Sequence, residues 1–318
     1  MLHIVKTRMD TGKLEELTLD TLEKGTWLQL TNPTAAELAA VSKAVNVDID
    51  NLRSALDDEE RSRTEIEDNY MMVITNVPVM RSQFAYDTLP LGIILTTDYI
   101  ITITLEAVEV INEFNQRNSH LFCTFKRTRF MFQLLYKSAT LYLRNLRQIS
   151  RLTDELELQL RKSMENEHLF RLLELQKALT YFTVSLRSNG TMLDKLLRMR
   201  TNSNLQHIIK VFEEDEDLLE DVIIENKQAR EMVEMYTHIV RSMLETFSSI
   251  ISNNLNRVMR FLTSITIILA IPTMIASFFC VNVPVPMAEE GYGFAMVVIL
   301  SLSAMASIAF LLRQKGMV

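Results

Sequence analysis

Two long uncharged runs near the C-terminus limit the possible fold more than any other feature of this chain. Residues 261–283 and 292–312 contain no Asp, Glu, Lys or Arg. Each run is close to the ~20 residues that a helix rising ~1.5 Å per residue needs to cross ~30 Å of hydrocarbon. A pair of buried core helices is the alternative. Because the two runs adjoin and charges flank both in one pattern, we expect two transmembrane helices.

The charges around these runs predict the orientation of the chain in the membrane. Basic residues flank the pair on its outer sides, at Arg257, Arg260, Arg313 and Lys315. The connection at 284–291 contains Glu289 and Glu290 and no base. Since Lys and Arg concentrate on the cytoplasmic side, both termini are predicted to be cytoplasmic. The first residues lack the apolar core of a signal peptide, so we expect a multi-pass protein of the plasma or inner membrane.

The composition indicates a sizeable folded part ahead of the two runs. The chain has 318 residues, of which 48% are hydrophobic and 23% charged, unlike a disordered or an all-membrane protein. A formal charge of −7 gives no reason to expect nucleic-acid binding. The two cysteines, Cys123 and Cys280, form no disulfide framework. Neither Gly nor Pro occurs between Gly190 and Pro272, which favours long helices there.

Residues 1–125 are predicted to form a cytoplasmic α+β domain. Helices are expected at 35–45, where Thr34 and Glu37 have the spacing of a capping box, and at 48–56. Strands are expected where residues typical of β-structure cluster, at 2–8, 14–17, 26–30, 63–67, 70–77, 89–97 and 99–105.

From about Arg127 onward the spacing of apolar residues becomes helical. Segments 130–160 and 165–199 predict an antiparallel helical pair. After a polar break at 201–204, a helix is expected to begin near Glu216 and to continue into the membrane. A single exposed helix of that length is unstable alone, so copies of the chain are the expected neighbours. The predicted segments are the helical pair 126–204, the stalk 205–260, the spans 261–283 and 292–312, the connection 284–291 and the cytoplasmic tail 313–318.

One side of the long helix is small or polar through the membrane. Ser and Thr inside lipid either hold packed helices together or line a water-filled axis. The same side continues below the membrane with polar residues, which favours the axis. The candidate pore-lining residues are Glu245, Ser252, Asn256, Met259, Leu262, Thr263, Thr266, Ala270, Thr273 and Ser277.

Several segments resemble the CorA family of divalent-cation transporters. Residues 271–284, Ile-Pro-Thr-Met-Ile-Ala-Ser-Phe-Phe-Cys-Val-Asn-Val-Pro, are similar to the end of its first membrane helix, which finishes in Gly-Met-Asn. Residues 256–263, 56–63 and 218–228 are similar to other family segments, and the order of parts agrees over nearly the whole chain. The resemblance implies a homopentameric funnel: a cytoplasmic α+β domain, long helices including a pore helix, and two C-terminal transmembrane helices.

The tripeptide differs from the family pattern at two of three positions. Cys280 and Val281 stand in place of Gly and Met, whereas Asn282 is kept. The resemblance implies that a ring of Asn282 side chains holds a hydrated cation such as Mg²⁺, which releases its waters reluctantly. Cys280 either packs as a small hydrophobe or favours a softer ion such as Zn²⁺. The zinc-transporting, ZntB-like branch also tolerates changes in this tripeptide.

Three further features each allow two interpretations. Glu289 and Glu290 either concentrate cations at the outer entrance or are solvated loop acids. The acidic run 213–217 suits the first turn of a helix, whereas the resemblance makes nearby Asp221 a ligand of a regulatory Mg²⁺ shared between subunits. Met259 and Leu262 either form a hydrophobic gate or simply pack.

The expected function is therefore a channel subunit for Mg²⁺ that is gated by a cytoplasmic divalent cation. Co²⁺ and Ni²⁺ are alternative transported ions. A Zn²⁺ transporter of the same architecture and a non-conducting membrane-anchored sensor or scaffold are the alternatives. The expected partners are copies of the chain, the lipid bilayer and divalent cations, without nucleic acid. No catalytic motif is present, so we expect no enzyme. No cofactor is expected beyond Mg²⁺, or alternatively Zn²⁺, as transported and regulatory ion.

Overall fold

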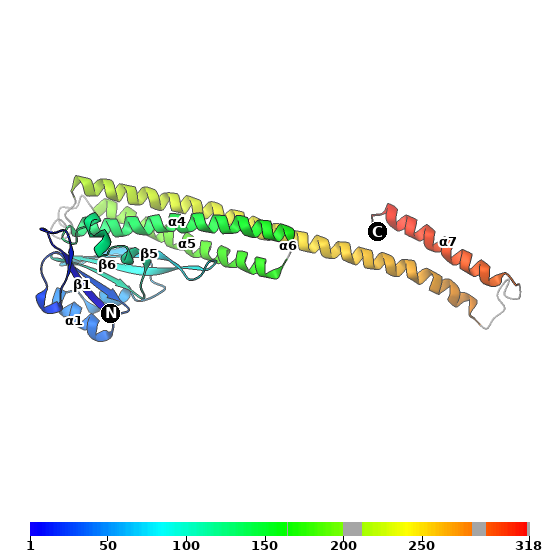
Figure 1. Ribbon diagram of the computed structural model, residues 1–318, viewed down its shortest axis with the longest axis horizontal. Coiled ribbons are helices and arrows are strands. Elements are labelled where there is room, and N and C mark those ends of the chain that lie inside the picture. Colours follow the sequence, from blue (N-terminus) through cyan, green and yellow to red (C-terminus); the bar gives the residue numbers. More distant parts are fainter. Residues whose placement is uncertain (164, 200–211, 282–290, 317–318) are drawn as a thin grey trace. The chain divides into compact units, whose positions relative to one another are not determined.

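The computed structural model describes residues 1–163, 165–199, 212–281 and 291–316. These residues form two units, Met1–Met243 and Leu244–Val318. One helix, α6 (Glu213–Phe279), begins in the first unit and ends in the second (Figure 1). The segment limits expected from the sequence, such as 125/126 and 204/205, stay predictions.

The first unit is built on a seven-stranded sheet with the order β2-β1-β3-β7-β6-β5-β4. Neighbouring strands are antiparallel, except that β3 and β7 run parallel. Residues 70–78 are buried without interruption, so both faces of the central strands are covered. The strands are β1 (Leu2–Thr7), β2 (Leu14–Glu16), β3 (Thr26–Thr31), β4 (Arg63–Ile66), β5 (Tyr70–Met80), β6 (Tyr86–Thr96) and β7 (Tyr99–Thr104).

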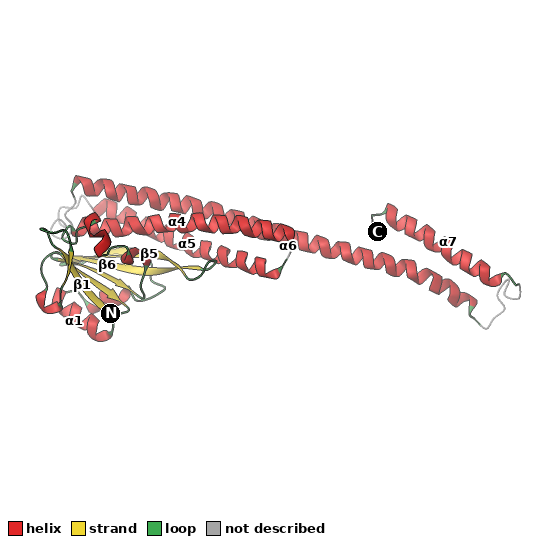
Figure 2. Ribbon diagram, in the orientation of Figure 1, coloured by secondary structure: helices red, strands yellow, loops and turns green. Residues whose placement is uncertain are grey.

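Helices cover the two faces of this sheet with separate cores. Adjacent residues of one strand point to opposite faces, so Leu28 joins the core under α1 (Ala35–Val45) and α2 (Ile49–Ser54). Its neighbour Trp27 joins the core under α4 (Arg127–Lys162) and α5 (Asn166–Met199). Figure 2 shows the strands between α1 and the α4–α5 pair. The predicted helical pair thus shares a core with the sheet.

The capping box expected at the start of α1 is confirmed. The backbone N–H of Glu37 donates to Thr34 Oγ1 at 3.2 Å, and the backbone N–H of Thr34 donates to Glu37 Oε2 at 2.8 Å. These two bonds satisfy donors that a helix end otherwise leaves unpaired. The helix then ends at Asn46, which adopts a left-handed conformation with φ of 54°.

Several predicted limits need correction. β5 and β6 extend to Met80 and back from Tyr86, beyond the expected 70–77 and 89–97, because the two strands pair up to their turn. Three short helical elements were not predicted, because each is at most six residues long and has no helical repeat. They are η1 (Leu19–Thr21), α3 (Glu109–Asn112) and η2 (Gln116–Leu121).

The long helix begins three residues earlier than predicted, at Glu213 rather than Glu216. Asp215 explains the difference: its Oδ2 accepts from the backbone N–H of Phe212 at 3.2 Å, as a residue in the first turn does. Its Oδ1 accepts from Arg129 Nη1 of α4 at 3.2 Å. The acidic run is therefore the first turn of α6, which the helix dipole favours.

The second unit contains the apolar part of α6 and the helix α7 (Gly293–Gln314). Both helices are long and apolar enough to cross a bilayer. Only 6% of the apolar window of α6 and none of that of α7 is buried, which does not fit core helices. The expected fold class, an α+β part followed by long helices and two apolar C-terminal helices, is confirmed.

Candidate functional site

The predicted polar side of α6 is exposed along its whole length. Every candidate from Glu245 to Ser277 has an exposed side chain in the isolated chain. The line of least exposure runs from Ser264, which is 0% exposed, through Ile268, Ile271 and Ile275. Because α7 is the other helix of this unit, we assign this line to its contact. At about 100° per residue, the polar side lies roughly opposite to that contact.

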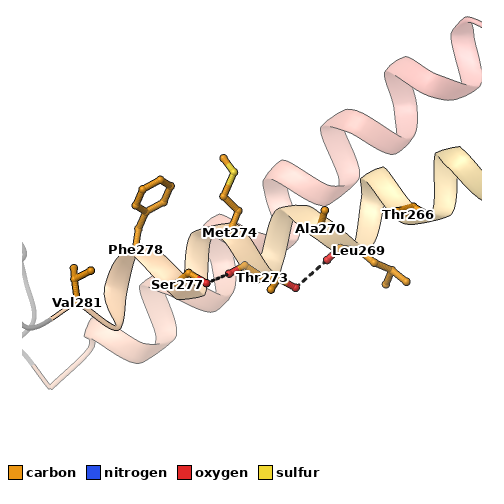
Figure 3. A pocket seen from close by; sticks show the side chains of 8 residues that line it. All are labelled: Thr266, Leu269, Ala270, Thr273, Met274, Ser277, Phe278 and Val281. Carbon is orange, nitrogen blue, oxygen red and sulfur yellow. Dashed lines mark hydrogen bonds between the residues drawn. The ribbon is translucent and has the colours of Figure 1, made fainter.

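Four of the predicted residues line one hollow of about 810 Å³ on this side (Figure 3). They are Thr266, Ala270, Thr273 and Ser277. Four larger residues, which the sequence did not predict as pore-lining, complete the lining. These four are Leu269, Met274, Phe278 and Val281. Three of them are sequence neighbours of the polar residues, and Val281 follows Ser277 by one turn. A prediction that covered a wider sector of the helix surface would have included them.

The hydroxyl groups that line the hollow donate into their own helix. Thr266 Oγ1 donates to the carbonyl of Leu262 at 2.9 Å, and Thr273 Oγ1 donates to that of Leu269 at 3.2 Å. Ser277 Oγ donates to the carbonyl of Thr273 at 2.8 Å (Figure 3). Since each hydrogen is used, the exposed oxygens retain lone pairs as acceptors. Such oxygens can accept hydrogen bonds from water, including the hydration water of a cation.

The polar side of α6 over residues 245–263, which precede the hollow in the sequence, carries both polar and large apolar side chains. Glu245, Ser252 and Asn256 are exposed polar side chains. Met259 is 54% and Leu262 is 51% exposed, as are other large apolar residues around this part of the helix, such as Phe261 at 51%. Thr263, one residue further, donates its hydroxyl to the carbonyl of Met259 at 2.8 Å. A single chain supplies one wall here, and a gate requires other walls.

The predicted selectivity mouth lies just beyond the end of α6. Cys280 follows Phe279, the last helical residue, and both Cys280 and Val281 are exposed. The backbone N–H of Cys280 donates to the carbonyl of Ser277 at 3.3 Å, which keeps the thiol close to the last turn. The remaining predicted residues of the mouth and entrance, Asn282, Glu289 and Glu290, lie outside the described residues.

The candidate regulatory residue Asp221 is exposed on α6, two turns beyond its first turn. Within the four described ranges, no group of three His, Cys, Asp or Glu side chains is placed to hold a metal ion. A cation at Asp221 would therefore need ligands from water or from another chain. The acids of the first turn are occupied differently, since Asp215 is buried against Arg129.

Comparison with known proteins adds a sequence match over most of the chain. The sequence model of the family described as CorA-like Mg²⁺ transporter protein matches residues 23–314. The cobalt/magnesium transport protein CorA of Methanocaldococcus jannaschii is 25% identical over 323 aligned positions, covering 98% of this chain and 96% of that protein.

Solved structures agree with the fold. The complete structure of the CorA magnesium transporter from Methanocaldococcus jannaschii matches with a TM-score of 0.84 and 23% identity, over 100% of this chain and 99% of that one. Full-length CmaX matches with a TM-score of 0.72 and 16% identity, over 99% and 96%. The ZntB cytoplasmic domain from Vibrio parahaemolyticus matches with a TM-score of 0.59 and 14% identity, over 80% and 97%.

Proposed function

The chain belongs to the family of CorA-like Mg²⁺ transporters, whose sequence model covers residues 23–314, and on this basis we propose that it is a membrane channel subunit for divalent metal cations. The observation that carries the proposal is the exposed side of α6, where Thr266, Thr273 and Ser277 present acceptor oxygens within an apolar span. Polar groups are costly in lipid unless they face water or a partner. A transporter of this family needs no catalytic step.

The conducting form is proposed to be a homopentamer with α6 innermost. One chain supplies one wall of a pore, and the polar side of α6 faces away from α7. If copies of α6 surrounded a shared axis, this polar side would face the water on the axis and α7 would face the lipid. The same arrangement supplies the neighbours that a helix of 67 residues requires.

Mg²⁺ is the proposed transported ion, and cytoplasmic Mg²⁺ the proposed regulator; no other cofactor is required. Acceptor oxygens bind the outward-pointing hydrogens of a hydrated ion, which suits Mg²⁺ because it keeps its waters. Asn282 would hold the ion at the mouth, with Glu289 and Glu290 attracting it from outside. Asp221 would share a regulatory ion with a neighbouring subunit, and Met259 with Leu262 would close the pore by excluding water.

Zn²⁺ transport is the second candidate, because the thiol of Cys280 is exposed directly after the last turn of α6. Five such thiols around a mouth would favour a softer cation than Mg²⁺. The resemblance of the soluble part to the ZntB domain is compatible with this candidate but concerns the fold alone.

In the membrane, we propose that both termini and the first unit face the cytoplasm. Arg257 and Arg260 precede the first apolar span, and Arg313 and Lys315 follow the second, so the bases lie at the same side of a two-helix hairpin.

Ion uptake into cells or vesicles that contain the full chain tests these proposals. Rescue of a Mg²⁺-uptake-deficient cell supports a Mg²⁺ channel, whereas Zn²⁺ flux without such rescue favours the second candidate. A well-expressed protein that moves neither ion would contradict transport and leave the sensor or scaffold.

The cysteine has its own test. Cys280→Gly should shift selectivity from Zn²⁺ toward Mg²⁺ if the thiol contacts the ion, and leave it unchanged if Cys280 only packs. Cys123→Ser is the matched control, because Cys123 is the second free cysteine and lies in the first unit. Mass measurement of the detergent-solubilised protein checks the pentamer; a monomer or dimer would leave no axis for conduction.

A further inference from the structure

A small cavity lies in the first unit, where α6 packs against α4, α5 and β5. The space open to the centre of a water-sized sphere is about 10 Å³. Every residue that lines it is at most 5% exposed. Four of these residues are polar, one from each of the four elements: Thr75, Ser138, Asn189 and Asn226.

The polar groups around this cavity have hydrogen-bonding capacity that the described residues do not use. Ser138 is 2% exposed, and its Oγ has no hydrogen-bond partner within them. Asn226 is 5% exposed and uses only Nδ2, which donates to the carbonyl of Leu186 at 3.2 Å. Asn189 Nδ2 donates one bond, to the carbonyl of Asn76 at 2.8 Å, although an amide nitrogen carries two hydrogens.

We propose that this cavity binds one internal water molecule, hydrogen-bonded to Ser138 Oγ and to the side-chain amides of Asn189 and Asn226. Buried polar groups in native proteins are nearly always paired, with protein or with ordered water. An internal water needs two to four polar partners and space of about one water-sized sphere, and the site supplies both. Its size admits a single water and no larger ligand.

The water would complete a polar joint between α6 and the rest of the first unit. Asn226 belongs to α6, whereas Ser138 and Asn189 belong to α4 and α5. The helices approach closely here: a Cβ atom on Gly190 would lie 3.3 Å from Asn226 Nδ2. A joint at this point fixes the axial position of α6, since sliding the helix by one turn would remove Asn226 from the cavity.

Thermal unfolding of the full-length protein in detergent tests the site through Ser138→Ala. If the cavity is dry, the substitution removes a buried unpaired hydroxyl and should leave the midpoint unchanged or raise it. If the cavity holds water, the same change removes a hydrogen bond and should lower the midpoint by about 2–4 °C. An unchanged or higher midpoint would overturn the proposal. Ser150→Ala, on the same helix but outside the cavity, measures the effect of the substitution on α4 itself.

A density map of the wild-type protein that resolves ordered waters is the second measurement, and it does not depend on a variant that folds. A peak within hydrogen-bonding distance of Ser138 Oγ supports the site, and an empty cavity overturns it.

The role of the joint in holding a pore helix rests on the proposed function. In Ser138→Ala, the Mg²⁺ concentration that half-inhibits uptake should shift at least severalfold. If wild-type protein carries no divalent cation at all, the proposed function fails while the midpoint and the density still decide the water site.

Discussion

The side chain of Asn189 makes several buried hydrogen bonds, and removing this side chain should destabilise the first unit strongly. Its Oδ1 accepts from Ser62 Oγ at 2.6 Å, from Thr75 Oγ1 at 3.1 Å and from the backbone N–H of Asn76 at 2.9 Å. Asn189→Ala leaves the hydroxyls of Ser62 and Thr75 without that acceptor and removes the bond from Asn189 Nδ2, whereas the backbone N–H of Asn76 keeps a second acceptor, Ser62 Oγ at 3.2 Å. Each unpaired buried group costs ~1–3 kcal/mol, and entering water recovers part of the sum, so we expect a loss of about 3–5 kcal/mol.

Thermal unfolding followed by circular dichroism of the detergent-solubilised protein measures this loss. For a unit of this size, each kcal/mol shifts the midpoint by about 2–4 °C, so the expected decrease is about 10 °C. Ser188→Ala is the matched control, because Ser188 makes one long bond of 3.3 Å to the carbonyl of Ser62. It should lower the midpoint by less than about 3 °C. A midpoint for Asn189→Ala within about 2 °C of wild type would refute the reasoning.

Three further predictions concern other parts of the chain. Gly92→Ala should prevent stable folding of the sheet, because its new Cβ would lie 2.5 Å from Ala55 Cβ, and the yield of folded protein after detergent extraction checks this. Hydrogen bonds from Arg144 hold the pKa of Glu109 below its ordinary value, so this pair stabilises the protein at neutral pH and the stabilisation disappears as the pH falls through the lowered pKa. Arg144→Gln should therefore weaken the acid dependence of stability below about pH 4.5, by no more than about 1 kcal/mol for a half-exposed pair. Thr273→Val should reduce ion uptake severalfold at equal surface expression, because it removes an acceptor oxygen from the hollow, whereas Thr273→Ser should retain uptake.

Patterns repeated over many residues made the fold predictable from the sequence. The apolar runs gave both C-terminal helices, and the three- and four-residue spacing gave α4 and α5 to within a few residues. The capping box at Thr34 and Glu37 was predictable because its two residues are neighbours in the chain. The short elements α3 and η2 were not, since packing against α4 rather than a repeat holds them in place.

The candidate site was predictable only as one side of a helix. The step of three or four residues identified Thr266, Ala270, Thr273 and Ser277, which the structure brings to one hollow. It could not identify the larger residues of the lining, such as Leu269 and Phe278, because they lie beside the polar residues and contribute through the size of their side chains. Roles that depend on a second chain, such as that of Asp221, stay predictions.

The polar network around Asn189 was hidden from the sequence for another reason. Ser62, Thr75 and Asn189 are separated by up to 127 positions and meet only because α5 lies on the sheet. Nothing in the local pattern distinguishes these residues from surface Ser, Thr and Asn.

The helix α6 continues over 67 residues with a single proline inside it. The helix contains no glycine, and its proline, Pro272, comes 59 residues after Glu213. Pro272 has no backbone N–H to donate to the carbonyl four residues earlier, so α6 bends most easily at this position. Thr273 and Ser277 follow this proline, so a bend at Pro272 would change their direction relative to Thr266 and Ala270, which precede it.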